Sequence, residues 1–124
     1  MKKEIITDAA PKTIGPYSVA IEVEDFIFLS GQIPVNPETG EIKETIQEQT
    51  NQVLSNIDGI LKEAGVTKEN IVKTTVFMDD LNEFTEMNAV YEEYFTKPYP
   101  ARSCIEISRL PKDVKLEIEC IVKK

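Results

Sequence analysis

Histidine and tryptophan are absent from this chain of 124 residues, and cysteine occurs only twice. Without histidine, the sequence excludes Ser-His-Asp and Cys-His catalysis, HExxH zinc sites and every histidine-ligated metal. Two cysteines cannot by themselves complete a zinc site of four ligands. The histidine-dependent hydrolases and the enzymes with a histidine-ligated metal are therefore ruled out.

Positive charge is also scarce, because 14 Lys and Arg stand against 22 Asp and Glu and give a net charge of −8. Nucleic-acid and anionic-membrane binders depend on clustered basic residues, so we expect neither partner. No apolar run approaches the ~18–20 residues of a membrane span. The start, Met1 to Asp8, is charged and not leader-like, so we expect a cytoplasmic protein in which Cys104 and Cys120 are free thiols.

The length and composition predict one globular domain over residues 1–124. Hydrophobic residues make up 41% of the chain, which is typical of a folded protein, while aromatic residues make up only 7%. Valine, isoleucine and leucine must therefore fill most of the core.

The first half of the chain predicts a hairpin followed by a helix. Residues 17–23 alternate in polarity and residues 26–29 are continuously apolar, with a turn at Glu24-Asp25. Thr45 and Glu48 are spaced as a capping box, with the hydroxyl and the carboxylate each accepting from a backbone N–H. Apolar residues then recur at helical spacing up to Gly65, and Gly59 either weakens this helix or permits close packing.

The second half predicts a strand over 71–78, a second helix, and two more strands over 103–108 and 114–122. The order ββ-α-β-α-ββ is typical of an α+β sandwich, a mixed sheet with both helices on one face. If the other face of the sheet is apolar, self-association is its natural cover.

Arg102 is the first residue that suggests chemistry. It stands at the start of a predicted strand behind two prolines, and its guanidinium can hold a carboxylate with two parallel hydrogen bonds. A surface salt bridge is the alternative. Cys104 shares the strand face of Arg102, so it is either a thiol activated by the neighbouring cation or a small buried hydrophobic residue.

Glu117 and Glu119 project from one face of the last predicted strand, opposite an aliphatic face. Partial desolvation would raise a carboxyl pKa there and suit it to acid–base catalysis. The alternative is that both glutamates line a solvated face.

Three further sites have a functional and a structural interpretation. Asn88 interrupts the apolar stripe of the second helix, where it either orients a substrate or caps a neighbouring loop. Gly31 ends a buried strand, where it either admits a ligand or forms a bulge. Asp79-Asp80 suggests a cation site, but helix capping explains the pair with fewer assumptions.

Taken together, these segments closely resemble the RidA (YjgF) family over about residues 10–122. The resemblance rests on Gly15-Pro16-Tyr17-Ser18, Ser30-Gly31-Gln32-Ile33-Pro34, Asn88 with Tyr91, Pro100-Ala101-Arg102-Ser103-Cys104, Leu110-Pro111-Lys112-Asp113 and Glu117-Ile118-Glu119. The stretch from Pro100 to Glu119 is the most specific part. One departure is Val19, where many relatives have glutamine.

The resemblance implies a chorismate mutase-like fold and a homotrimer with an active site at each subunit interface. It implies a deaminase that hydrolyses 2-imino acids, formed from enamines such as 2-aminoacrylate, to 2-keto acids and ammonia without a cofactor or metal. Arg102 would clamp the substrate carboxylate and Glu117 would position water and move protons. Residues that would line the pocket are Tyr17, Ser30, Gly31, Asn88 and Cys104.

Two other functions are consistent with the resemblance. The same pocket would bind a small 2-keto carboxylate in a non-catalytic or regulatory member. Ribonuclease activity or inhibition of translation is also attached to the family, but the net charge of −8 and the absence of histidine weigh against it.

Overall fold

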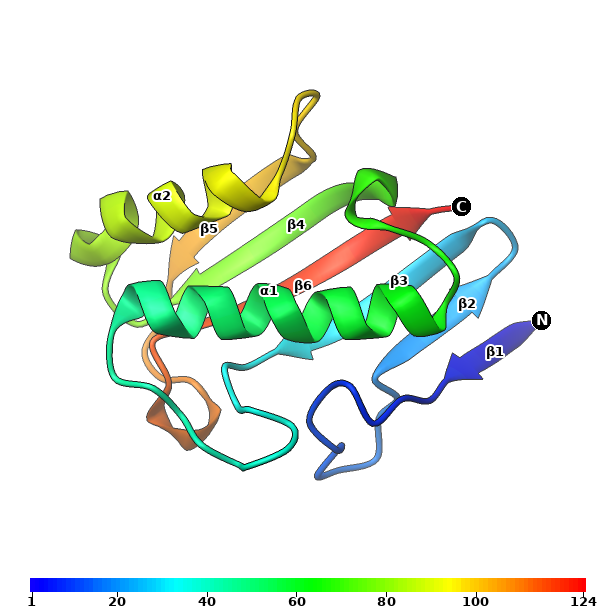
Figure 1. Ribbon diagram of the computed structural model, residues 1–124, viewed down its shortest axis with the longest axis horizontal. Helices are drawn as coiled ribbons and strands as arrows, with labels where there is room; N and C mark the ends of the chain where they lie inside the picture. Colours follow the sequence, from blue (N-terminus) through cyan, green and yellow to red (C-terminus); the bar gives the residue numbers. More distant parts are fainter.

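Six strands form one mixed sheet, and two α-helices cover one of its faces (Figure 1) in this computed structural model, which describes residues 1–124. The strands are β1 (Lys2–Ile5), β2 (Ala20–Val23), β3 (Phe26–Gln32), β4 (Ile71–Met78), β5 (Ala101–Glu106) and β6 (Leu116–Lys123). The helices are α1 (Ile46–Glu63) and α2 (Phe84–Tyr94), with short 3-10 turns η1 (Lys68–Asn70), η2 (Leu81–Glu83) and η3 (Pro111–Asp113).

The strands lie in the order β1-β2-β3-β6-β4-β5. All neighbouring strands are antiparallel except β4 and β5, which are parallel because α2 crosses over between them. Helix α1 packs on β3 and β6 and lies beside α2 (Figure 1). Consequently β5 is an edge strand and β6 lies in the interior of the sheet, with β4 between them.

The predicted α+β class, with both helices on one face, is confirmed. The predicted order of elements was wrong at the N-terminus, where β1 pairs with β2 and makes the order βββ-α-β-α-ββ. Only Ile5 of β1 is buried, so this polar edge strand lacks the alternation that predicts a strand. Strand β2 starts at Ala20 instead of residue 17, and β3 continues past Leu29 to Gln32.

Helix α1 begins and ends where the sequence predicts, but its cap differs in one bond. The Thr45 hydroxyl accepts from the backbone N–H of Glu48 at 3.1 Å, as expected. The Glu48 carboxylate instead accepts from the Thr45 hydroxyl, at 2.9 Å, and not from the backbone of Thr45. Gly65 has a φ of +75°, the left-handed conformation that follows a helix end at little cost to glycine.

The face of the sheet opposite the helices has no second layer. Residues paired across neighbouring strands share a face, so Phe28 and Ile121 lie together there, as do Phe77 and Ile105. Phe28 is 46% exposed and Ile105 45% exposed. This open face of the sheet is therefore partly apolar, as the self-association argument requires. Neither helix is long and apolar enough to cross a bilayer.

Gly59 allows the N-terminal loop to lie directly on α1. A Cβ atom at this position would stand 2.6 Å from the Ala9 Cβ and 2.7 Å from the Ala9 carbonyl oxygen. Backbone atoms cannot yield to such an overlap as a flexible side chain would. Close packing is therefore the reason for glycine here, and the cost in helix propensity is accepted.

We expect Gly59→Ala to lower the free energy of unfolding by about 1–3 kcal/mol, because overpacking against Ala9 outweighs the gain in helix propensity. Urea denaturation at a fixed protein concentration measures the change. Asn51→Ala, at an exposed position of α1, is the matched control and should be neutral or slightly stabilising. A Gly59→Ala protein more stable than the wild type would contradict this packing.

Candidate functional site

Six of the residues singled out by sequence line two separate cavities: Tyr17, Ser30, Gly31 and Glu117 line the first, and Asn88 and Arg102 line the second. The first, here called the Glu117 cavity, has a volume of about 370 Å³ and is bounded by the N-terminal loop, the end of β3, η3 and β6. Its lining includes Tyr17, Val19, Ser30, Gly31, Gln32, Lys112 and Glu117. The second, the Arg102 cavity, has a volume of about 460 Å³ and is lined by Asn88, Tyr91, Glu92, Tyr99, Pro100 and Arg102.

Glu117 lies on the open face of the sheet, directly opposite Phe77 of β4. On its other side the carboxylate occupies the space above Gly31, where any Cβ atom would overlap it. Burial raises the pKa of Glu117 above its ordinary value, and the negative charge of Glu119 raises this pKa further. The predicted partial desolvation is thus confirmed for Glu117, while Glu119 is exposed and fits the solvated-face alternative.

The end of β3 is shaped by an irregularity in its pairing with β6, between Leu29 and Gln32. Within it, the Ser30 hydroxyl donates to the carbonyl of Ser18 at 2.6 Å, and the Ser30 N–H donates to the carbonyl of Val19 at 2.9 Å. The bulge predicted as the structural interpretation is therefore confirmed, and the side chain that approaches Gly31 closely is that of Glu117. The bulge serves to bring Ser30 and Gly31 to the cavity wall.

Gln32 and Lys112 are among the lining residues of the Glu117 cavity that were missed as site residues in the sequence. Gln32 is only 5% exposed, and its side-chain amide donates to the carbonyl of Ser30 at 3.1 Å. Lys112 belongs to η3 and has a φ of +57°. Both lie inside the segments that carry the family resemblance, which was the available signal.

Arg102 is a half-buried cation held in place by neutral groups. Its Nη1 donates to the Asn88 side-chain oxygen at 2.7 Å. The guanidinium carbon lies 4.7 Å from the centre of the Tyr91 ring and 5.5 Å from that of Phe84. The Tyr91 hydroxyl is in turn hydrogen-bonded to the Thr74 hydroxyl at 2.7 Å. These contacts fix the guanidinium without neutralising it.

Arg102 forms no ion pair within its own chain, so the surface salt bridge proposed as the alternative is absent. Asn88 does not cap a loop. Its side-chain oxygen orients the Arg102 guanidinium, and both residues line the same cavity. An unpaired, oriented guanidinium beside an amide is a suitable receptor for a carboxylate.

Cys104 follows Arg102 on the same face of β5, as predicted, but it lines neither cavity of the single chain. Burial raises the pKa of its thiol, and the opposing effect of Arg102 is smaller. The interpretation as a thiol activated by the guanidinium was therefore wrong, and Cys104 packs against the core as a small, partly buried residue. Burial raises the pKa of Cys120 to about 12.

The two cavities lie on opposite sides of the sheet. Arg102 on β5 is paired with Thr74 on β4, and Thr74 is paired with Cys120 on β6. Thr74 and Cys120 are buried, so these three side chains lie on the face covered by the helices. Glu117 is on the open face. A single chain therefore does not bring the guanidinium and the carboxylate into one site.

The carboxylates elsewhere do not suggest a metal centre. Asp80 caps η2 by accepting from the backbone N–H of Asn82 at 2.9 Å, which is the structural interpretation given to the Asp79-Asp80 pair. No group of three or more Cys, Asp or Glu side chains is arranged to hold a metal ion.

Comparison with known proteins gives consistent matches over the whole chain. The family model described as endoribonuclease L-PSP matches residues 7–124. A RutC family protein of Pyrococcus abyssi is 57% identical, with 100% of this chain and 99% of the relative covered. A protein of Escherichia coli K12 named 2-iminobutanoate/2-iminopropanoate deaminase is 51% identical, with 98% and 97% covered.

Solved structures agree with the sequence relatives. The YjgF gene product of E. coli is 49% identical and superimposes with a TM-score of 0.95, covering 98% of each chain. The structure of E. coli TdcF with bound serine is 46% identical, also with a TM-score of 0.95 and 98% of each chain covered. The match extends over the segments that carry both cavities, and we conclude that the chain belongs to the RidA (YjgF) family, whose family model is described as endoribonuclease L-PSP.

Proposed function

We propose that this protein is an imine deaminase that hydrolyses short 2-imino carboxylates, formed from enamines such as 2-aminoacrylate, to 2-keto acids and ammonia. The observation that carries the proposal is the unpaired guanidinium of Arg102, which Asn88 and two aromatic rings hold ready for a carboxylate. The name of the E. coli relative at 51% identity supports the same substrate class. Serine, bound in the TdcF structure, is likewise a small amino carboxylate.

The site is proposed to form between two copies of this chain. Arg102 and Glu117 lie on opposite faces of the sheet, so a second copy must supply the missing half. A contact between two different surfaces of the same chain closes into a ring when the rotation permits, and the family resemblance implies a homotrimer. The partly apolar open face of the sheet, including Phe28 and Ile105, would be covered in such an assembly.

The first step is binding of the substrate. Asn88 accepts from Nη1 of Arg102, which leaves the other guanidinium N–H groups free to donate to both carboxylate oxygens. In a chain with a net charge of −8, this local cation has to attract the anion against the field of the whole surface. Imines without a carboxylate lack the group that the guanidinium recognises.

The second step is hydrolysis of the C=N bond. Glu117 of the adjoining copy holds a water molecule and takes its proton as the oxygen attacks the carbon of the imine protonated on nitrogen, which gives a neutral carbinolamine. Glu117 then gives this proton to the amino nitrogen, and the C–N bond breaks as the hydroxyl oxygen forms the C=O bond. The hydroxyl proton passes to Glu117, and ammonia and the 2-keto acid are released. An imine is already activated toward attack by water, so the proposed reaction needs neither a cofactor nor a metal ion.

We do not propose nuclease activity, despite the description of the family model, because the negative charge and the absence of histidine remain arguments against it. We propose a reducing, cytoplasmic setting, in keeping with two cysteines that are free in the structure.

Arg102→Ala should lower kcat/KM by about 10- to 100-fold, because the substrate carboxylate loses a charge-assisted pair of hydrogen bonds. The assay couples the protein to a dehydratase that forms 2-aminoacrylate from serine and follows pyruvate. Arg109→Ala is the matched control, since Arg109 is exposed and pairs with Asp113 at the surface. All proteins should keep the solution mass of the wild type, which we expect near three times 14.0 kDa.

Full activity of Arg102→Ala would reject the carboxylate clamp. If the wild type binds 2-oxobutanoate saturably but does not accelerate imine hydrolysis, the protein is a non-catalytic member that binds keto acids.

Glu117→Gln should lower kcat by about 100-fold or more, because the amide cannot accept the proton of water. The raised pKa of Glu117 means that the carboxylate is lost at a higher pH than for an ordinary glutamate. The wild-type kcat/KM, corrected for the uncatalysed reaction, should therefore fall below that raised pKa, and Glu117→Gln should lack this acid limb.

Glu119→Gln provides the control for the pH profile. Its charge raises the pKa of Glu117, so its removal should move the acid limb to lower pH while catalysis is retained. An unchanged rate in Glu117→Gln, or an acid limb that persists in that variant, would exclude Glu117 as the proton acceptor.

A further inference from the structure

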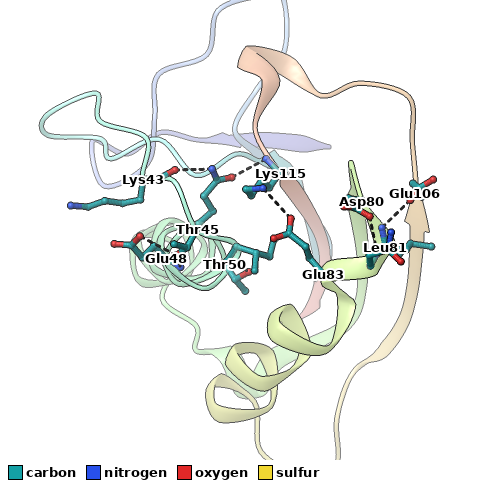
Figure 2. Close-up of polar contacts among 12 residues, drawn as sticks. Lys43, Thr45, Glu48, Thr50, Asp80, Leu81, Glu83, Glu106 and Lys115 are labelled. Atoms are coloured by element: carbon teal, nitrogen blue, oxygen red, sulfur yellow. Dashed lines mark hydrogen bonds and ion pairs between the residues drawn. The ribbon is translucent and has the colours of Figure 1, made fainter.

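Lys115, just before β6 begins, is held by contacts with three other residues. Its backbone N–H donates to the Gln49 side-chain oxygen at 2.8 Å, and its carbonyl accepts from the backbone N–H of Asp79 at 3.1 Å. Its ammonium group lies 3.0 Å from the Glu83 carboxylate. Figure 2 shows the ammonium group of Lys115 directed at the Glu83 carboxylate. Two residues further along the chain is Glu117.

Gln49 makes this junction rigid. It is only 4% exposed, and both ends of its amide are used, because its Nε2 donates to the carbonyl of Lys43 at 2.7 Å. The backbone of Lys115 is therefore fixed to α1 through a buried side chain. The ion pair with Glu83 is itself partly shielded, with side-chain exposures of 32% for Lys115 and 30% for Glu83.

The other end of the ion pair leads to the Arg102 cavity. Glu83 is the last residue of η2 and directly precedes Phe84, the first residue of α2, whose ring lies 5.5 Å from the Arg102 guanidinium. Asn88 and Tyr91, the other two residues that hold Arg102, belong to the same helix. A shift of the first turn of α2 would therefore disturb the guanidinium.

Strand β5, which carries Arg102, is tied to the same turn. At the end of β5 the Glu106 carboxylate accepts from the backbone N–H of Leu81 at 2.9 Å (Figure 2). Turn η2 is thus held on two sides. Glu106, the last residue of β5, contacts it from the strand that carries Arg102, and Lys115 contacts it from the position just before β6, the strand that carries Glu117. These two strands are not neighbours in the sheet, because β4 separates them.

We propose that Lys115, through its ion pair with Glu83, is a positioning residue for the deaminase reaction: it fixes the start of α2, and with it the Arg102 guanidinium, on the sheet of its own chain. Lys115 lines neither cavity, so it acts through other residues and does not touch the substrate. This role rests on the proposed function. An isolated surface pair would contribute little, but this pair is partly shielded and one of its partners is fixed by a buried amide.

The test compares Lys115→Met, which keeps the aliphatic stem, and Glu83→Gln, which keeps the shape, with the double variant. We expect each single variant to lower kcat/KM about tenfold through misplacement of the guanidinium, with weaker binding of 2-oxobutanoate. The double variant should lose no more than the single variants, because all three lack the same contact. Lys115→Arg should recover activity, because a guanidinium can still pair with Glu83.

Lys124→Met is the matched control, since Lys124 follows the far end of β6 and its surface pair with Glu22 has a similar distance of 2.9 Å. Rates are measured well below the unfolding temperature of every variant, with the solution mass checked, so that loss of folded protein does not account for the difference.

Several outcomes would overturn the role of Lys115 alone: an active wild type with unchanged kcat/KM in Lys115→Met, a loss equal to that of Lys124→Met, or additive losses in the double variant. A wild type that neither hydrolyses imines nor binds 2-oxobutanoate would reject the proposed function and the positioning role together.

Discussion

Side chains alternate between the two faces of a β-sheet, and this alternation decides where the chemistry of this protein lies. Arg102 on β5 and Glu117 on β6 project to opposite sides, because their registers with β4 place one on the helix face and the other on the open face. The helices α1 and α2 fill only the first side. The cavities around the two residues are therefore separate in one chain, and the proposed deaminase site takes one residue from each of two copies.

The Arg102 cavity and the Glu117 cavity differ in the surroundings of their charged groups. The guanidinium is oriented by an amide and two aromatic rings, without an acidic partner, so its charge remains available. The carboxylate of Glu117 is partly buried above a glycine and beside Glu119, so its pKa is raised. A cation kept unpaired and an acid kept partly desolvated are suited to hold an anionic substrate and to exchange a proton with water.

The sequence predicted the fold class well, because hydrophobic periodicity and helix signals such as Thr45 and Gly65 are local. It missed β1, an edge strand with one buried residue, because such a strand has no periodic pattern. Arg102 and Glu117 were found as candidates from their places on predicted strands. Their surroundings could not be predicted, because contacts such as Asn88 with Arg102 and Gly31 with Glu117 join residues far apart in the chain.

Cys104 shows the limit of that reasoning most clearly. The sequence places a cation two residues away, which suggests an activated thiol, but only the folded chain shows that burial outweighs the cation and raises the pKa. The Lys115 junction is a second example, since Gln49, the segment from Asp79 to Glu83, and Lys115 itself come from three different parts of the chain.

The central claim is that each active site takes Arg102 from one copy of the chain and Glu117 from another. Equal amounts of Arg102→Ala and Glu117→Gln protein, each nearly inactive alone, are unfolded, mixed and refolded together. If the site is shared in a ring of three, about one quarter of the sites combine an intact Arg102 with an intact Glu117, and about one quarter of wild-type imine hydrolysis should return. If mixed assemblies form and no activity returns, the two residues do not act in a site shared between copies, and the account is wrong.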